Sequence, residues 1–130
     1  MKLFNIDIDS KTQKFLKNHW PDRLSVILDC NQEKFKYLHR GTNTLAFRLP
    51  KKPDLIDILK ETGPLISTSV NPEGLEPAKN IQEAKNYFGN KLDFYVEDAS
   101  VNLISSPSTV IKIDSEGKVE IVRQGIVKIT

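Results

Sequence analysis

The sequence is poor in the residues on which several common protein chemistries depend. It has a single cysteine, Cys30, so neither an internal disulfide nor a multi-cysteine zinc site can form within the chain. No stretch approaches 18 consecutive apolar residues, which excludes a membrane-spanning helix. Residues 1–11 carry Asp7 and Asp9 but no long apolar run, so we predict no signal peptide. These absences together favour a protein of the reducing cytoplasm.

The familiar catalytic motifs are also missing. The chain has no glycine-rich phosphate loop, no GxGxxG fingerprint and no serine in a GxSxG elbow. His19 and His39 lack the spacing of metal ligands, so we predict two solvated histidines and no metal site. The net charge of +2 is too small to indicate nucleic acid or a membrane surface by itself.

What is present is an ordinary globular composition, 38% hydrophobic and 28% charged. A chain of 130 residues suits one compact domain, and we predict a single domain over residues 1–130. Helical patterns alternate with strand patterns early in the chain, and strand patterns cluster in the last third. This order predicts an α/β fold in which helices pack on a mixed, twisted sheet.

Local signals divide the chain into elements. Asp9 or Ser10 is placed to cap a helix, and Asn80 with Glu83 three residues later forms a capping-box pattern. Gly63 is typical of a helix end. Helices are therefore predicted over residues 11–20, 53–63 and 81–89, with a short helix or loop at 33–38. Strand patterns cover residues 24–30, 44–50, 64–68, 92–98, 108–114, 117–125 and 126–130, and residues 114–118 form a hairpin turn.

Residues 63–80, GPLISTSVNPEGLEPAKN, place a run of hydroxyl side chains where a predicted strand meets a Gly/Pro loop. Such groups can hold a polar ligand, because ligands commonly bind beyond strand ends in α/β sheets. The alternative is a capped turn in which the Ser and Asn side chains bond only to their own backbone. The residues by themselves leave both interpretations open.

Three further features are candidates for a binding site. Arg48 shares one strand face with Thr44, and it is either a solvated edge residue or a guanidinium that faces a cleft and binds a carboxylate or phosphate. Residues 105–110, SSPSTV, again place hydroxyls at the entrance of a strand. Arg123 stands two residues before a glycine, at a strand end.

Five segments in order resemble the YrdC-like threonylcarbamoyl-AMP synthase family. They are WPDRLSVIL, TNTLAFRLP, GPLISTSVNPEG, PSTVIKID and VEIVRQG, which extend from about residue 20 to residue 125. The family also has an N-terminal portion with a Pro-Thr strand end and a Lys/Arg motif, and residues 1–19 match neither. The resemblance therefore identifies the chain with the C-terminal part of a YrdC-like domain, as a single N-terminally truncated domain.

The resemblance implies a nucleotidyltransferase. In that family, threonine, bicarbonate and ATP become threonylcarbamoyl-adenylate and pyrophosphate, and the product serves the modification of adenosine 37 in certain tRNAs. Mg²⁺ is expected to accompany the ATP, because it neutralises phosphate charge. Loss of the N-terminal half of the cleft would weaken ATP binding and could abolish turnover by the isolated chain.

The resemblance also assigns residues to the two larger substrates. It implies threonine binding by Arg48, Ser69 and Ser108, and ATP binding by Thr44, Asn71, Lys79 and Arg123. It identifies no catalytic residue and no metal ligand. A bidentate guanidinium suits the threonine carboxylate, and cations suit the phosphates.

Two other roles remain open. The chain could be a non-catalytic module that binds double-stranded RNA or tRNA through the basic residues Lys34, Lys36, Arg40, Lys51 and Lys52, which could equally form a solvated face. It could also associate with itself, because a truncated domain would expose a sheet edge.

Overall fold

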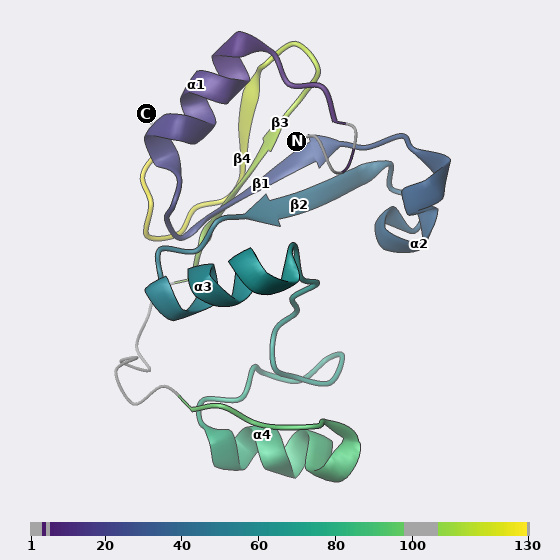
Figure 1. The fold of residues 1–130 in the computed structure, drawn as a ribbon, viewed down its shortest axis with the longest axis vertical. Helices are drawn as coiled ribbons and strands as arrows, with labels where there is room; N and C mark the ends of the chain where they lie inside the picture. Colours follow the sequence, from purple (N-terminus) through teal and green to yellow (C-terminus); the bar gives the residue numbers. More distant parts are fainter. Residues whose placement is uncertain (1–3, 5, 98–106, 130) are drawn as a thin grey trace. The chain divides into compact units, whose positions relative to one another are not determined.

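The computed structural model describes residues 4, 6–97 and 107–129, and the chain forms two compact units. The first unit comprises Met1–Gly63 and Ser106–Thr130, and the second comprises Pro64–Ser105 (Figure 1). Each unit is described by itself below. The single domain over residues 1–130 stays a prediction.

Within its described residues, the first unit contains a four-stranded sheet, three α-helices and one short 3-10 helix. In chain order its elements are α1 (Ser10–His19), β1 (Leu24–Asp29), η2 (Glu33–Phe35), α2 (Lys36–His39), β2 (Thr44–Arg48), α3 (Pro53–Thr62), β3 (Thr109–Ile113) and β4 (Val119–Arg123). The strand order is β2-β1-β3-β4. Strands β1 and β3 are parallel, whereas β2 and β4 pair antiparallel with them at the two edges. The predicted α/β class with a mixed sheet is confirmed.

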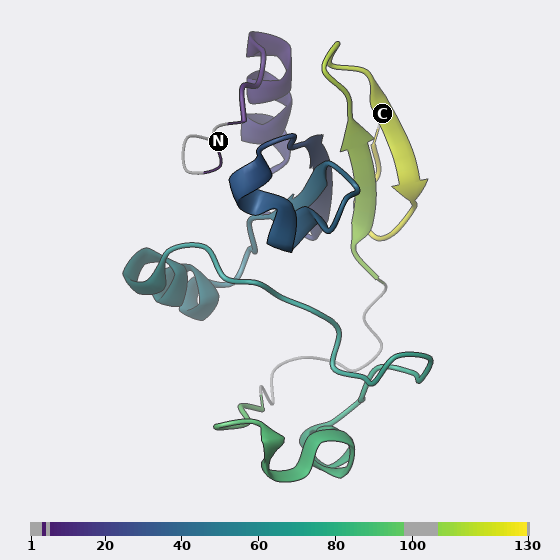
Figure 2. The same ribbon diagram turned by 90° about the vertical axis from the view of Figure 1, so that its right-hand side faces the viewer.

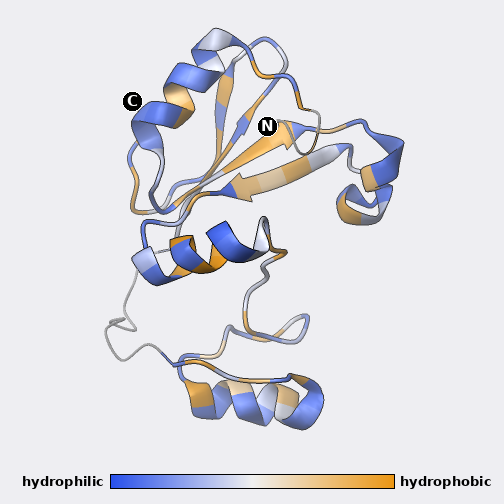
Figure 3. Cartoon of the chain, in the orientation of Figure 1, coloured by the Kyte–Doolittle hydropathy of each residue, from blue (hydrophilic) through white to orange (hydrophobic). Residues whose placement is uncertain are grey.

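The core lies on one face of this sheet. Alternate residues of the two central strands are fully or almost fully buried: Leu24, Val26, Leu28, Ile111 and Ile113. Helix α1 adds Leu16 to the same cluster. Figure 2 shows α1 on one side of β3 and β4, and Figure 3 shows how hydrophobic β1 is along its length. The opposite face carries the intervening positions of β1 and β3, which are only half-buried or exposed.

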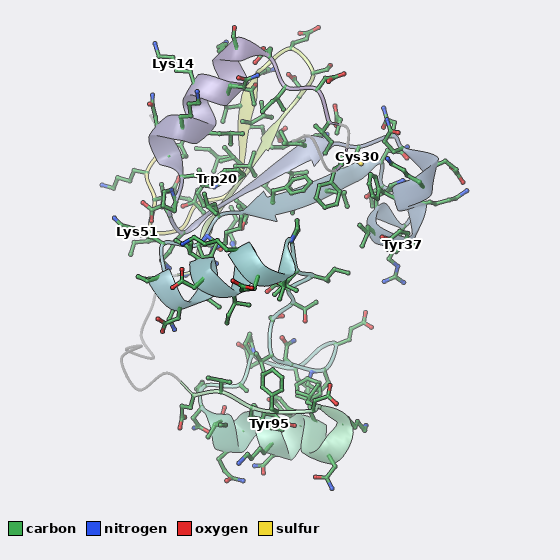
Figure 4. All side chains as sticks on the ribbon, in the orientation of Figure 1. Lys14, Trp20, Cys30, Tyr37, Lys51 and Tyr95 are labelled. Carbon is green, nitrogen blue, oxygen red and sulfur yellow. The ribbon has the colours of Figure 1, made fainter. Side chains whose placement is uncertain are left out.

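Helix α1 begins and ends where its flanking residues predict. The side chain of Asp9 accepts the Thr12 N–H at 2.6 Å and caps the helix. At the other end, the Trp20 indole donates to the carbonyl of Leu24 at 2.9 Å, which ties the helix end to the start of β1 (Figure 4). The capping signals also predicted α3 correctly, because it starts at a proline and stops at Gly63 with a φ of 75°.

The cap of α1 should make stability sensitive to acid. The backbone hydrogen bond from Thr12 is the main cause that lowers the pKa of Asp9 below its ordinary value of 3.8. A carboxyl whose pKa is lowered by folding stabilises the folded state, and this stabilisation is complete when the pH is above the ordinary pKa. It is lost as the pH falls through the pKa of the folded state. We expect the melting temperature of the wild type to fall more steeply below about pH 4 than that of Asp9→Asn, because asparagine caps without ionising. Parallel slopes in thermal melts would contradict this.

The second unit contains α4 (Ile81–Phe88) and the turn η3 (Gly89–Lys91). Asn80 caps α4 by accepting the Glu83 N–H at 2.8 Å, as its spacing predicted. The Glu83 carboxylate accepts the Lys79 N–H at 2.8 Å, and so holds the chain that enters the helix. Tyr95, labelled in Figure 4, donates to the carbonyl of Gly89 at 2.7 Å and anchors the chain that leaves it.

Three predicted strands are wrong. Residues 64–68, 92–97 and 126–129 are irregular, and residues 98 and 130 lie outside the described part. Ile66, Phe94 and Val96 are 78%, 77% and 84% exposed, and the patterns at 64–68 and 92–97 pair with no strand among the described residues of the second unit. A β pattern forms a strand only where a neighbouring strand satisfies its backbone groups. The 114–118 hairpin turn is confirmed by the antiparallel pairing of β3 with β4.

The solvated state predicted for His39 is also wrong. His39 is only 5% exposed, and its Nδ1 accepts the Gly41 N–H at 3.2 Å. No helix in the described residues is both long enough and apolar enough to cross a membrane. Cys30 is free and buried.

Candidate functional site

Four residues form one row across one end of the sheet. Arg48 pairs with Ser25, Ser25 pairs with Val110, and Val110 pairs with Arg123. The row therefore runs from edge strand β2 through both central strands to edge strand β4. Two predicted site residues, Arg48 and Arg123, lie at this end, and the third, Ser108, immediately precedes β3. We call this end, defined by Arg48, Ser108 and Arg123, the arginine end.

The surroundings of Arg48 favour an anionic ligand. Burial lowers the pKa of the Arg48 guanidinium, the positive charge of Arg23 lowers it further, and Asp22 partly opposes this. An arginine keeps its charge at neutral pH despite such a shift, so the cation is held in a partly desolvated place beside another cation. A carboxylate or phosphate at this position would offset the repulsion between the two cations, as Asp22 already does in part. The side chain nevertheless remains exposed enough for a ligand to reach it.

Arg123 and Ser108 contact each other directly. The Nε and Nη2 atoms of Arg123 donate to the backbone carbonyl of Ser108 at 3.2 and 2.9 Å, and Nη2 also lies 3.3 Å from the Ser108 hydroxyl. One edge of the guanidinium is therefore used within the protein. Its Nη1 group forms no hydrogen bond with the described residues and is left for a ligand.

Thr44 lies on the same face as Arg48 but farther along β2. Thr44 pairs with Asp29 and Arg48 pairs with Ser25. The two residues are four positions apart on one strand, so their side chains lie on the same face of the sheet, as predicted. Four residues of strand separate them by roughly 13 Å. The Thr44 hydroxyl donates to the Thr42 hydroxyl at 3.3 Å.

The other end of the central strands is acidic. A cavity of about 80 Å³ lies where β1 and β3 finish, and carboxylates are prominent in its lining: Asp7, Asp9, Asp29 and Asp114. These groups would repel a phosphate or a carboxylate, so charge favours the arginine end for an anionic substrate. No group of three His, Cys, Asp or Glu residues within the described ranges is arranged to hold a metal ion.

The remaining predicted residues belong to the second unit. Asn71 closes the loop by donating from Nδ2 to the carbonyls of Pro72 and Leu75 at 3.0 and 2.8 Å. These two acceptors fix the amide orientation, and they leave the buried Oδ1 without a hydrogen-bond partner among the described residues. Ser69 and Lys79 are exposed on the same loop. The loop therefore combines turn closure with a buried acceptor that no described residue pairs.

The structure joins some predicted residues and leaves others apart. Within the first unit, Arg48, Ser108 and Arg123 share the arginine end, and Thr44 shares only a face with Arg48. Ser69, Asn71 and Lys79 share one loop of the second unit. Sequence reasoning missed Arg23, although a cation directly before a buried strand was a visible signal. Residues 105 and 106 of the predicted hydroxyl cluster lie outside the described residues.

Comparison with known proteins gives one family. The Sua5/YciO/YrdC family model, described as "Telomere recombination", matches residues 1–125. A threonylcarbamoyl-AMP synthase of Marinobacter nauticus is 34% identical over 97 residues, which cover 73% of this chain and 50% of the relative. One of Histophilus somni is 30% identical over 119 residues, which cover 91% of this chain and 62% of the relative. The chain spans about half the length of several of the curated relatives it matches.

A solved structure has the same fold. The crystal structure of P. abyssi Sua5 complexed with L-threonine matches with a TM-score of 0.77 and 21% sequence identity. The match covers 92% of this chain and 35% of that one. At this identity the likeness shows the fold alone.

Proposed function

Because the chain belongs to the Sua5/YciO/YrdC family, we propose that it carries the threonine- and ATP-binding part of a threonylcarbamoyl-AMP synthase. The observation that carries this proposal is the arginine end, where Arg48 on edge strand β2 and the bonded pair Arg123 and Ser108 beside edge strand β4 lie at the same end of the sheet. The proposed reaction joins threonine, bicarbonate and ATP into threonylcarbamoyl-adenylate and releases pyrophosphate.

Arg48 is proposed to bind the threonine carboxylate. The partly desolvated guanidinium beside Arg23 has the charge and the planar fork that a carboxylate needs. Ser108, which is half-buried at the start of β3, would contact the same substrate. Ser69 is the third proposed threonine contact.

ATP is proposed to bind through Thr44, Asn71, Lys79 and Arg123. The unused Nη1 group of Arg123 suits a phosphate oxygen, and the exposed ammonium of Lys79 adds positive charge. Asn71 is the proposed contact from the loop, and its buried Oδ1 is an acceptor that no described residue pairs.

The chemistry that these residues can perform is positioning and charge stabilisation. The threonine amine forms an N–C bond to the bicarbonate carbon as a C–O bond breaks and water leaves. An oxygen of the resulting carbamate then forms an O–P bond to the α-phosphate as the bond to pyrophosphate breaks. No nucleophilic side chain is needed for either bond. Cations that hold the carboxylate and the phosphates stabilise the charge that develops as pyrophosphate leaves.

The proposed reaction also involves Mg²⁺ and bicarbonate, and its product is proposed to serve tRNA modification. Mg²⁺ is proposed to enter with ATP, because the described residues offer no carboxylate cluster for a resident ion. Bicarbonate is the proposed source of the carbamoyl carbon. The product would serve tRNA modification in the cytoplasm, and the edge strands β2 and β4 are the proposed places for self-association.

Release of pyrophosphate tests the proposed reaction. We expect pyrophosphate to form when the protein is mixed with MgATP, bicarbonate and L-threonine, and to fall to background when L-threonine is omitted. Background release with all substrates, together with an unchanged melting temperature when ATP and L-threonine are added, would refute the function for this chain.

A further inference from the structure

Two backbone segments beside the arginine end approach more closely than any side chain would permit. A Cβ atom on Gly125 would overlap the carbonyl oxygen of Pro107 and would lie 2.5 Å from the carbonyl carbon of Ser108 and from the nitrogen of Thr109. Real Cβ atoms essentially never come within 3.0 Å of a heavy atom outside their own residue and its two neighbours in the chain. A glycine is therefore required at this position for reasons of space.

The side chain of Thr109 joins the same two segments. Thr109 is fully buried, and its hydroxyl donates to the carbonyl of Val127 at 2.6 Å. The same oxygen accepts the N–H of Gly125 at 3.0 Å. The hydroxyl thus acts as donor and acceptor at once, which a valine or alanine cannot do. A backbone bond from Ile126 to Pro107 at 3.2 Å lies beside it.

These contacts surround the peptide bond between Ser108 and Thr109, whose carbonyl oxygen accepts hydrogen bonds from Arg123. The guanidinium of Arg123 is bound to the carbonyl of Ser108, and the next residue along the chain is Thr109. The residue two positions after Arg123 is Gly125. Any shift between the two segments would therefore change the position of the Ser108 hydroxyl and the direction of the free Nη1 group together.

We propose that Thr109 and Gly125 are positioning residues for the substrate site, because they fix Ser108 and Arg123 relative to each other. The inference rests on the proposed function, in which Ser108 contacts threonine and Arg123 contacts ATP. The brace formed by Thr109 and Gly125 then sets the distance between the two substrates. Displacements of about 1 Å at such groups can reduce activity on the order of 100-fold.

The test compares Thr109→Val with Thr109→Ser, because serine keeps the hydroxyl and valine keeps the shape. We expect the exchange of the Arg123 Nε–H with water, followed by nuclear magnetic resonance in labelled protein, to be slow in the wild type and in Thr109→Ser. It should accelerate about tenfold or more in Thr109→Val, as expected when a hydrogen bond is lost. Arg48, whose Nε–H makes no hydrogen bond with the described residues, is the internal reference. The affinities for ATP and L-threonine should fall about 10- to 100-fold in Thr109→Val and be restored in Thr109→Ser.

Unchanged exchange at Arg123 in a folded Thr109→Val protein would overturn the proposal. If this variant does not fold, the exchange of the Thr109 hydroxyl proton with water is measured in the wild type. Slow exchange supports the proposed positioning role of Thr109, and fast exchange overturns it. A wild type that binds neither substrate would refute the proposed function, and the brace would then be judged on the exchange rates alone.

Discussion

Replacement of Arg48 by lysine is expected to weaken L-threonine binding by about 10- to 100-fold, which corresponds to roughly 1.5–3 kcal/mol for charged hydrogen bonds. Lysine keeps the charge but loses the planar fork that binds both oxygens of a carboxylate. Because the Arg48 side chain is exposed on an edge strand and outside the core, the melting temperature without ligand should change little. Titration calorimetry in the presence of a non-hydrolysable ATP analogue measures the difference.

Arg40→Lys is the matched control for this experiment. Arg40 is an exposed arginine of the same unit, at the end of α2, and it lies outside the proposed site. The control should bind L-threonine as the wild type does. Equal affinities of Arg48→Lys and Arg40→Lys would show that Arg48 is only a solvated edge residue, which is the other interpretation that the sequence left open.

The largest expected effect on stability belongs to Gly125→Ala. The new methyl group would overlap the carbonyl of Pro107 and the backbone of Ser108 and Thr109, so the segments must separate. Overpacking of this kind costs about 1–3 kcal/mol, occasionally more, and we expect the upper end of that range because the backbone has to move. The loss of unfolding free energy can be measured by denaturant titration.

Gly41→Ala separates crowding from backbone conformation. Gly41 has a φ of 89° but no atom within 4 Å of its would-be Cβ. Its replacement should cost only the strain of the left-handed region, about 1–2 kcal/mol. The account is contradicted if Gly125→Ala loses no more stability than Gly41→Ala, because the close approach at Gly125 would then be dispensable.

The sequence predicted those parts of the fold that are determined by local signals. Asp9 and Asn80 cap helices with short-range hydrogen bonds, and Gly63 ends a helix, so a few neighbouring residues suffice to identify them. Strand β1 was identified for a different reason. It is central in the sheet, and its nearly continuous hydrophobic run reflects that position.

The wrong predictions depend on pairing that no local pattern reveals. Residues 64–68 and 92–97 have good strand patterns, but they pair with no strand among the residues of the second unit that the structure describes. Likewise, nothing in the sequence indicated that Arg123 would bond the Ser108 carbonyl, because that contact follows from the register between β3 and β4. The face shared by Thr44 and Arg48 was predictable, since it needs only the alternation of one strand.

The central claim is that this chain binds ATP and L-threonine, and its melting temperature with both ligands tests that claim most directly. At concentrations far above the dissociation constants, we expect the two together to raise the melting temperature by about 5 °C or more. D-threonine with ATP should give only the shift that ATP gives alone, because the carboxylate and the hydroxyl must both reach their partners. An unchanged melting temperature with ATP and L-threonine would contradict the account.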